Sequence, residues 1–248
     1  MNHQEYRRIV SEAEIAVLMI HGIVGTPHHF DNLLPLIPEN WSVVNLLLEG
    51  HGRGAAEFGA SSMEAWKGQV SRELDGLLAF HEKVLIVGHS MGTLFAIQSA
   101  IDCPEKVAAL FLQAVPLRPY VHPKMTIASA KLLFDVGVEE DPLARALEKD
   151  SGVDVDLRLW EYVLWPARFV ELLAECERIR HAIPQLKVPT VAIQSCKDEL
   201  VSDHSIHDLE KNEYVRVVKM ENAGHFGYEG EELETMLKEF ESMIQSVM

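Results

Sequence analysis

Residues 84–92 read Val84-Leu85-Ile86-Val87-Gly88-His89-Ser90-Met91-Gly92. A short apolar run that ends at a glycine is typical of a strand buried on both faces, and we expect a helix over the residues that follow, Met91 to Asp102. The glycines on either side of Ser90 remove Cβ atoms where neighbouring backbone approaches closely in a sharp strand-to-helix turn. Such a turn presents the serine oxygen beside the N–H groups that begin the helix. The stretch therefore predicts a nucleophilic serine at position 90.

The rest of the chain alternates between short apolar runs and helix-like segments. Five further strands are predicted, over residues 16–20, 41–48, 107–112, 190–193 and 214–218. Further helices are predicted at 26–37, 61–81, 202–211 and 229–247, with Thr26 as an N-cap before Pro27 and with a capping box formed by Ser61 and Glu64. Strands that alternate with helices favour a mostly parallel sheet flanked by helices. The predicted class is therefore α/β.

A serine hydroxyl becomes a useful nucleophile only when a base removes its proton. Of the twelve histidines, His225 follows the last predicted strand and precedes the last predicted helix, which makes it the expected base. The base needs a carboxylate that fixes its tautomer and stabilises the imidazolium. Asp198 lies just after the predicted strand at 190–193, and the chain order serine, acid, histidine is that of a known type of catalytic triad. Glu199 and Asp203 are the alternatives for the acid.

Acyl transfer also needs two N–H donors for the oxyanion of the tetrahedral intermediate. The residue after the nucleophile supplies one of them, so Met91 N–H is the first expected donor. The second is expected from the loop after the strand at 16–20, where Gly22 permits a close approach. We favour Ile23 N–H, with Val24 N–H as the alternative.

Five segments together resemble the serine α/β-hydrolase family. These segments are His21-Gly22, Glu49-Gly50-His51-Gly52, Gly88-His89-Ser90-Met91-Gly92, Asp198-Glu199-Leu200-Val201 and Gly224-His225-Phe226. Within the family, the loop at 21–27 and the Gly-His-Gly segment look like those of bacterial carboxylesterases and monoacylglycerol lipases. The resemblance implies an α/β-hydrolase fold and the hydrolysis of carboxylic esters through an acyl-serine intermediate on Ser90, His225 and Asp198. It implies no cofactor.

Residues 117–184 interrupt the alternation of strands and helices. The segment is rich in proline and in predicted helix, so we expect a helical cap inserted into a core formed by 1–116 and 185–248. Its apolar residues suggest a binding site for a hydrophobic acyl or alcohol group, although they could equally form the packing core of the cap itself. The expected substrate contacts are Val24, His89, Trp160, Trp165 and Phe169.

Composition excludes several classes of protein. The chain has 22 basic and 38 acidic residues, a net charge of −16, so neither nucleic acid nor an anionic membrane is expected as a partner. Neither a signal peptide nor a membrane-spanning run is expected. Cys103, Cys176 and Cys196 form no Cys-x-x-Cys motif and are expected to be small, buried thiols in the reducing cytoplasm.

Other histidines are interpreted as structural. We expect His21, His51 and His89 to shape the turns around the site rather than to act as its base. Two pairs, His28-His29 and His204 with His207, have spacings that metal ligands can use, but no third and fourth ligand is evident, so no metal site is expected.

The sequence thus predicts a serine hydrolase of short- to medium-chain acyl esters or monoacylglycerol-like esters. A neutral or apolar ester is the expected substrate, because about half of the net negative charge falls after residue 196, near the predicted acid and base. The alternatives are a thioesterase, a C–C hydrolase or an acyltransferase on the same triad, and a ligand receptor without catalysis. The sequence leaves the oligomeric state open.

Overall fold

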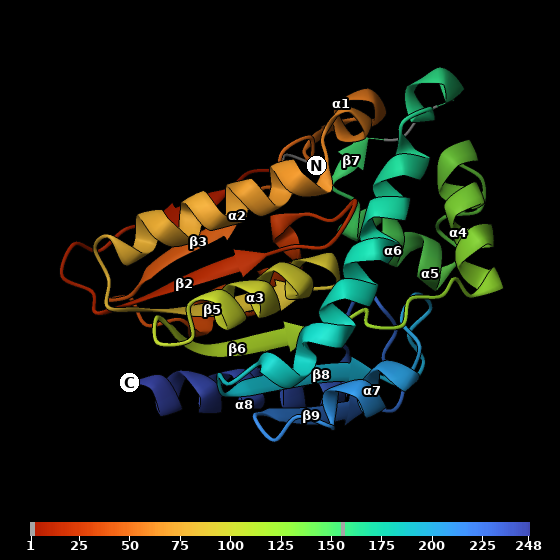
Figure 1. The fold of residues 1–248 in the computed structure, drawn as a ribbon. Helices are drawn as coiled ribbons and strands as arrows, with labels where there is room; N and C mark the ends of the chain where they lie inside the picture. The colour runs from red at the N-terminus through yellow and green to blue at the C-terminus, as the bar shows by residue number, and fades with distance from the viewer. Residues whose placement is uncertain (1–2, 155–156) are drawn as a thin grey trace.

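A seven-stranded sheet lies at the centre of the fold (Figure 1). The structure is a computed structural model that describes residues 3–154 and 157–248. Its strands, in the order of the sheet, are β1 (Tyr6–Arg8), β3 (Ser42–Leu46), β2 (Ile15–Ile20), β5 (Lys83–His89), β6 (Val107–Gln113), β8 (Thr190–Ser195) and β9 (Val215–Met220). β1 pairs antiparallel with β3, and the other strands pair in parallel. The prediction of a mostly parallel sheet flanked by helices is confirmed.

Helices cover both faces of the sheet because its central strands carry apolar side chains on both faces. In β2, Leu18 and Ile20 lie in one buried cluster, whereas Val17 and Met19 point to the opposite face and lie in another. The first cluster packs against α2 (Met63–Leu78), α3 (Met91–Asp102) and α6 (Trp165–Ala182), and the second packs against α8 (Gly230–Val247) and the 3-10 helices η1 (Pro27–Phe30) and η2 (Leu34–Leu36). Burial of each such side chain contributes about 1.5–3 kcal/mol.

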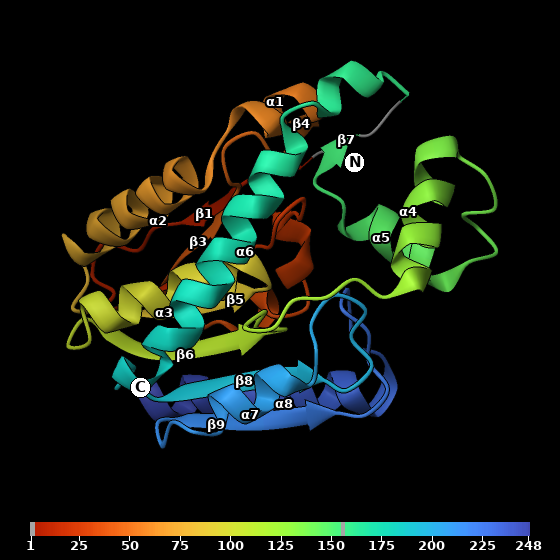
Figure 2. The same ribbon diagram turned by 45° about the vertical axis from the view of Figure 1, so that its right-hand side comes forward.

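The segment predicted as a cap lies beyond the carboxyl ends of the strands. It contains α4 (Pro123–Phe134), α5 (Pro142–Asp150), β7 (Val153–Asp154) and the 3-10 helix η3 (Leu159–Tyr162). Figure 2 shows α4 and α5 standing together at the end to which the strand arrows point. β7 pairs with the two-residue strand β4 (Arg53–Gly54), which precedes α1 (Ala55–Ala60).

Helix α6 connects the cap to the core. Trp165, at its start, packs on Phe58 of α1, whereas Cys176 and Ile179 of its second half are buried in the cluster that covers α3. The 3-10 helix η4 (Ile183–Gln185) then leads to β8. We propose that the cap ends within α6, rather than at residue 184, because the second half of this helix is part of the core layer.

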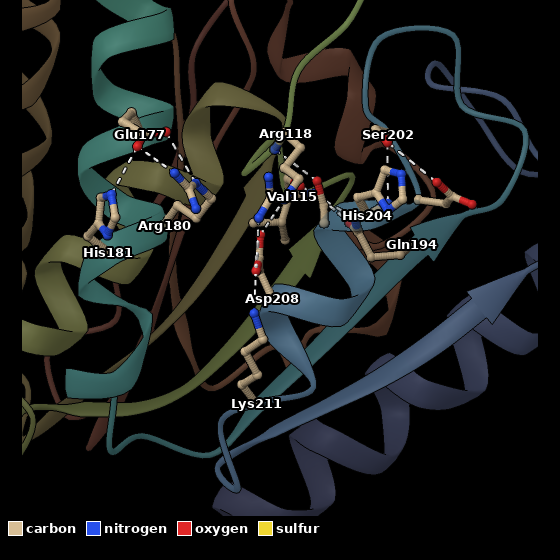
Figure 3. A network of polar contacts seen from close by, with 12 residues as sticks. Val115, Arg118, Glu177, Arg180, His181, Gln194, Ser202, His204, Asp208 and Lys211 are labelled. Carbon is tan, nitrogen blue, oxygen red and sulfur yellow. Dashed lines mark hydrogen bonds and ion pairs between the residues drawn. The ribbon is translucent and has the colours of Figure 1, made fainter.

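Polar contacts fix the chain where it leaves β6 for the cap (Figure 3). Arg118 Nε donates to Asp208 Oδ2 at 2.6 Å, and Lys211 Nζ donates to Asp208 Oδ1 at 2.8 Å. Asp208 belongs to α7 (His204–Leu209), on the segment that joins β8 to β9. Val115 N–H donates to Gln194 Oε1 of β8 at 2.5 Å. The entrance to the cap is therefore held by β8 and α7, the strand and helix that lie before and after Asp198 in the chain.

Several local predictions were wrong in their details. The predicted helix at 26–37 is two short 3-10 helices, because Pro35 lacks the N–H that a continuous helix needs. Thr26 is nevertheless the N-cap of the first, with Pro27 following it. Helix α2 begins one residue later than the predicted capping box requires, since its N-cap is Ser62, which accepts from Ala65 N–H at 3.1 Å.

One strand and one helix also differ from expectation. β1 was not predicted, because three residues are too few for a recognisable strand pattern. The predicted helix at 202–211 is shorter, at His204–Leu209.

Among the cysteines, Cys176 is buried as expected, whereas Cys103 is half-buried and Cys196 is exposed. Within the residues described, no helix has the length and apolar character needed to cross a membrane.

Candidate active site

Ser90 lies at the turn between β5 and α3 in a backbone conformation that residues other than glycine rarely adopt. Its φ is 49° and its ψ is −122°. The flanking glycines make this turn possible: a Cβ on Gly92 would lie 2.0 Å from the Ile20 carbonyl oxygen, and one on Gly88 would lie 2.9 Å from Thr93. Thr93 Oγ1 donates to the Ser90 carbonyl at 2.6 Å. The turn therefore fixes the serine at the carboxyl end of the central strand.

Two side chains from distant parts of the chain line up with the Ser90 hydroxyl. His225 Nε2 lies 3.1 Å from Ser90 Oγ. On the other side of the ring, His225 Nδ1 lies 2.8 Å from Asp198 Oδ2 and 3.0 Å from Asp198 Oδ1. His225 follows β9 and Asp198 follows β8, so adjacent parallel strands deliver both groups to the same edge of the sheet. The structure thus brings together the three residues predicted to form the triad.

The Asp198 carboxylate is fixed by backbone donors. Its Oδ1 accepts from Leu200 N–H at 2.7 Å and from Val201 N–H at 2.8 Å. Asp198 is 2% exposed, so these bonds and the His225 ring compensate the cost of its burial. An acceptor held in this way orients the His225 ring with its Nδ1 proton toward Asp198 and its Nε2 lone pair toward Ser90.

Opposing effects act on the pKa of His225. Burial lowers it, because the charged imidazolium loses its hydration. The negative charge of Asp198 and the hydrogen bond to it raise the pKa and outweigh burial, so the net shift is upward. The ring is therefore a stronger proton acceptor than a histidine buried without a carboxylate.

Neither alternative acid faces the ring of His225. Glu199 Oε2 accepts from the backbone N–H of His225 at 2.9 Å, and a Cβ on Gly224 would lie 2.9 Å from that same carboxylate oxygen. Asp203 is exposed at the start of α7, where Ser202 Oγ donates to it at 3.4 Å. The geometry favours Asp198 over both residues, and Glu199 instead holds the loop that carries the base.

The loop after β2 lies directly against the serine. A Cβ on Gly22 would lie 2.9 Å from Ser90 Cβ. Val24 has a φ of 57°, which is strained for a β-branched residue, and its N–H donates to His51 Nε2 at 3.1 Å. Because that N–H is occupied, the geometry favours Ile23 over Val24 as the loop donor. Met91 N–H, at the start of α3, has no partner within its own helix.

A pocket at Ser90 has about 50 Å³ of space that a water-sized group can occupy. It is lined by Gly22, Ile23, Val24, Gly25, His89, Ser90, Leu147, Asp150, Ser151, Leu200, His225 and Phe226. Val24 and His89, two of the expected substrate contacts, are among these residues. Leu147, Asp150 and Ser151 reach the pocket from the end of α5, so the cap contributes one of its walls.

The three aromatic residues expected to contact substrate do not line this pocket. Trp160 is 71% exposed on η3, and Phe169 is 40% exposed on α6. Trp165 packs on Phe58, and its indole N–H donates to the Ala55 carbonyl at 2.8 Å. The prediction that these side chains face the substrate is therefore corrected. Their positions depend on how α6 docks on α1, which no local sequence pattern reveals.

Two further residues at the pocket, Asp150 and His29, were not predicted from the sequence to belong to the site. His29 Nδ1 donates to Asp150 Oδ1 at 2.9 Å, and His29 Nε2 lies 2.8 Å from Gln113 Oε1. The His29 ring also stacks on His89, with centroids 3.6 Å apart and planes 20° apart. The one available signal was the pair His28-His29, which sequence analysis considered only as a metal ligand.

One group of side chains has ligand atoms close enough to be considered for a metal. These atoms of His29, His89 and Asp150 lie within 4.8 Å of one another. Imidazole nitrogens bind metals through lone pairs in the plane of the ring. Because the two rings are stacked, their lone pairs lie in nearly parallel planes and do not converge on one ion. The geometry therefore fits a polar cluster better than a metal centre.

Comparison with curated proteins finds esterases and a lipase homologue. A pimeloyl-[acyl-carrier protein] methyl ester esterase of Neisseria meningitidis serogroup A is 26% identical, over 91% of this chain and 75% of that protein. The protein of the same name from serogroup B strain MC58 is 30% identical, over 61% of this chain and 51% of that protein. A monoglyceride lipase homologue of monkeypox virus is 24% identical, over 47% of this chain and 45% of that protein.

Solved structures share the fold across the whole chain. A structure described with LipS and LipT, two metagenome-derived lipolytic enzymes, has a TM-score of 0.72 at 20% identity and covers 98% of both chains. The Paleococcus ferrophilus monoacylglycerol lipase has a TM-score of 0.68 at 18% identity, covering 98% of this chain and 99% of that one. The sequence pattern of the alpha/beta hydrolase family matches residues 17–236. The protein whose strands deliver Ser90, Asp198 and His225 to one edge of the sheet is a member of the alpha/beta hydrolase family.

Proposed function

We propose that the protein is a serine esterase that hydrolyses short- to medium-chain, uncharged carboxylic esters. The contact that supports this most directly is the continuous line from Asp198 through His225 to Ser90, at 2.8 and 3.1 Å. The curated relatives named as methyl ester esterases favour an ester over other acyl substrates.

In the first half of the proposed reaction, Ser90 Oγ attacks the ester carbonyl carbon as its proton passes to His225 Nε2. The N–H groups of Ile23 and Met91 donate to the oxyanion of the tetrahedral intermediate. Asp198 stabilises the imidazolium that has formed. The intermediate collapses when His225 gives its proton to the leaving alcohol oxygen, and the acyl group stays on Ser90.

In the second half, water takes the place of the alcohol. His225 Nε2 removes a proton from the water, whose oxygen attacks the acyl carbon. The second tetrahedral intermediate is stabilised by the same two N–H groups. Its collapse breaks the bond to Ser90 Oγ, which receives the proton from His225, and the carboxylic acid leaves.

The pocket supports the proposed size and charge of the substrate. The space at Ser90 that a water-sized group can occupy is about 50 Å³, and so small a space favours a small acyl or alcohol group. Apolar contacts come from Leu147, Leu200 and Phe226, and Asp150 provides the one carboxylate among the described lining residues. A negative charge on the substrate would lie in the same enclosed space as that carboxylate, which disfavours anionic esters.

Turnover of p-nitrophenyl acetate, butyrate and octanoate tests this proposal. Wild type is expected to hydrolyse the acetate and butyrate faster than the octanoate, and Ser90→Ala is expected to lower kcat/KM at least about a thousandfold. Ser71→Ala is the matched control, because Ser71 is exposed on α2. Equal turnover by wild type and Ser90→Ala would contradict the proposal.

A second substrate comparison separates an esterase from a thioesterase or an acyltransferase. Ethyl butyrate and butyryl-CoA are supplied to wild type at equal concentration, with and without an acceptor alcohol, and the products are identified. The proposal predicts butyrate as the product of the ethyl ester. Faster cleavage of the thioester, or transfer of the acyl group to the alcohol in place of hydrolysis, would contradict it.

A further inference from the structure

Asp150 places a carboxylate from the cap in the pocket that contains Ser90. It is the last residue of α5 and is 9% exposed. Among the described residues, its carboxylate has one hydrogen-bond partner, the Nδ1–H of His29, which donates to Oδ1 at 2.9 Å. A carboxylate oxygen accepts more than one hydrogen bond when donors are present. This buried group therefore has unused acceptor capacity beside the reacting serine.

The position of Asp150 is fixed by the chain that follows it. Gly152 N–H donates to the Val24 carbonyl and Gly52 N–H donates to the Gly152 carbonyl, both at 2.6 Å. Gly152 also lies so close to the loop after β2 that a Cβ on it would be 1.8 Å from the Gly25 carbonyl oxygen. The end of α5 is thus held against the backbone that borders Ser90, so Asp150 belongs to a built wall of the pocket.

A second unused acceptor lies beside Asp150. The Nε2 of His89 faces the carbonyl oxygen of His225 at 3.1 Å, so Nε2 carries the proton and donates it. Nδ1 of the neutral ring is then an acceptor. It is buried and has no hydrogen-bond partner among the described residues. Burial lowers the pKa of His89 well below its usual value, and the neighbouring His29 and His225 lower it further, so the ring beside Asp150 is neutral.

His89 and Asp150 border the same small space, but His89 Nδ1 has no exposed surface there, so the Asp150 carboxylate is the acceptor open to a substrate. The ligand atoms of His89 and Asp150 lie within 4.8 Å of each other, and both residues line the pocket of Ser90. An apolar substrate in this place would take water from the Asp150 carboxylate without supplying a donor, which costs about 1–3 kcal/mol. A substrate that brings a hydroxyl group to the carboxylate avoids that cost.

We propose that the Asp150 carboxylate forms a subsite for a hydroxyl group of the substrate, so that the enzyme prefers hydroxylated esters over apolar esters of the same size. This inference rests on the proposed esterase function. A neutral hydroxyl fits better than a cation because the Asp150 carboxylate already faces the His29 ring. Asp150 is therefore a specificity-determining residue contributed by the cap.

Two pairs of uncharged esters test the subsite, one with the hydroxyl in the alcohol part and one with it in the acyl part. The first pair is 2-hydroxyethyl butyrate and propyl butyrate, and the second is ethyl 3-hydroxybutyrate and ethyl 3-methylbutyrate. In at least one pair, wild type is expected to show a kcat/KM about tenfold higher for the hydroxylated ester. Asp150→Ala is expected to bring that ratio close to one, and Asp150→Asn to give an intermediate ratio.

Control measurements distinguish the hydroxyl subsite from a cation site and from a general loss of activity. Glu148→Gln removes a negative charge from the exposed face of α5 and should keep the wild-type ratio. A general loss of activity in a variant lowers kcat/KM for both esters of a pair by the same factor. The ratio of the two kcat/KM values is therefore unaffected by it. Butyrylcholine brings a charge without a donor, and its preference over 2-hydroxyethyl butyrate would overturn the proposal in favour of a cation site.

Two further outcomes would also overturn the proposal. If wild type hydrolyses both members of each pair equally, the Asp150 carboxylate is satisfied by ordered water only. If the preference persists in Asp150→Ala, it arises elsewhere in the pocket. In both cases the esters are still hydrolysed, so the result differs from failure of the esterase proposal, in which no ester of either pair is turned over.

Discussion

His225 is the residue on which the proposed chemistry depends most closely. Its pKa is lowered by burial and raised by Asp198, and the net shift is upward from 6.5. The ring must be neutral to accept the proton of Ser90. Activity should therefore rise with pH through a midpoint above 6.5, because protonated His225 predominates below that midpoint.

Asp198→Asn tests this balance. The variant keeps the size of the side chain but removes the charge, so burial should dominate and the midpoint of the kcat/KM profile should fall below that of wild type. The asparagine amide can also hold the ring in the wrong tautomer, with a loss of about 10⁴ in kcat. The measurement is a pH profile of butyrate ester hydrolysis between pH 5 and 9.

Glu199→Gln is the control for that profile. Glu199 accepts from the backbone N–H of His225, and its charge contributes less to the pKa than that of Asp198. We expect a smaller downward shift of the midpoint and activity much closer to wild type. An unchanged midpoint in Asp198→Asn would show that Asp198 does not control the base.

At the scale of elements, the site is built where the cap meets two core loops. The backbone of Gly152, just before β7, is hydrogen-bonded to Val24 on one side and to Gly52 on the other. His51, in the same Gly-His-Gly segment, accepts from Val24 N–H through Nε2 and so carries its proton on Nδ1, which faces the Glu49 carbonyl. The cap thus supports the loop that is proposed to hold the oxyanion.

Gly152→Ala should disturb this junction. Its Cβ would lie 1.8 Å from the Gly25 carbonyl oxygen, so either the cap or the loop after β2 must move. We expect a loss of stability of about 1–3 kcal/mol and a fall in kcat of at least about tenfold. Thermal unfolding and ester turnover measure the two effects.

Gly76→Ala is the matched glycine variant. Gly76 lies within α2, and a Cβ there meets nothing within 4 Å. Alanine is the better helix former by about 1 kcal/mol, so this variant should be as stable as wild type or more stable, with unchanged turnover. If Gly152→Ala behaved like Gly76→Ala, the close contact between cap and loop would be irrelevant to catalysis.

At the scale of the whole molecule, buried histidines connect stability to pH. Burial lowers the pKa of His21 to about 4, and the pKa values of His51 and His89 also lie well below 6.5, with burial as the main cause. The unfolded chain therefore binds more protons than the folded chain between about pH 4 and 6.5. Stability must rise with pH across that window. His225 acts in the opposite direction, because its pKa is raised.

Thermal unfolding at pH 5 and pH 7 measures the net effect of these histidines on stability. His21 alone should contribute about 2 kcal/mol of extra stability at pH 7, and His51 and His89 add to it, so the Tm should be several degrees higher than at pH 5. His21→Gln should reduce the difference in Tm, whereas His207→Gln, at an exposed position on α7, should preserve it. A Tm that is higher at pH 5 would contradict this account of the buried histidines.

The sequence was most informative where the determinants are local. The strand, the turn at Ser90 and the start of α3 depend on nine neighbouring residues, so their prediction needed no tertiary contact. The positions of Asp198 and His225 after two strands followed from the rule that parallel strands share a carboxyl edge. These are the residues that the structure brings within hydrogen-bonding distance.

The wall formed by the cap could not be predicted in the same way. Asp150 reaches the pocket because the end of α5 packs against the loop after β2. That contact is between Gly152 and Gly25, which are more than one hundred residues apart in the chain. The aromatic residues Trp160, Trp165 and Phe169 stood out in the sequence for their size. Their packing partners on α1 and their exposure depend on how α6 docks, which is a property of the assembled fold.

The most direct test of the proposed mechanism is to identify the residue that carries the acyl group during turnover. The protein is mixed with p-nitrophenyl butyrate, quenched in acid within the first turnovers, digested and analysed by mass spectrometry. The mechanism predicts a butyryl group on Ser90 in wild type and no acylated peptide in Ser90→Ala or His225→Gln. Turnover with the acyl group on another side chain, such as the exposed thiol of Cys196, or with no acylated peptide at all, would contradict it.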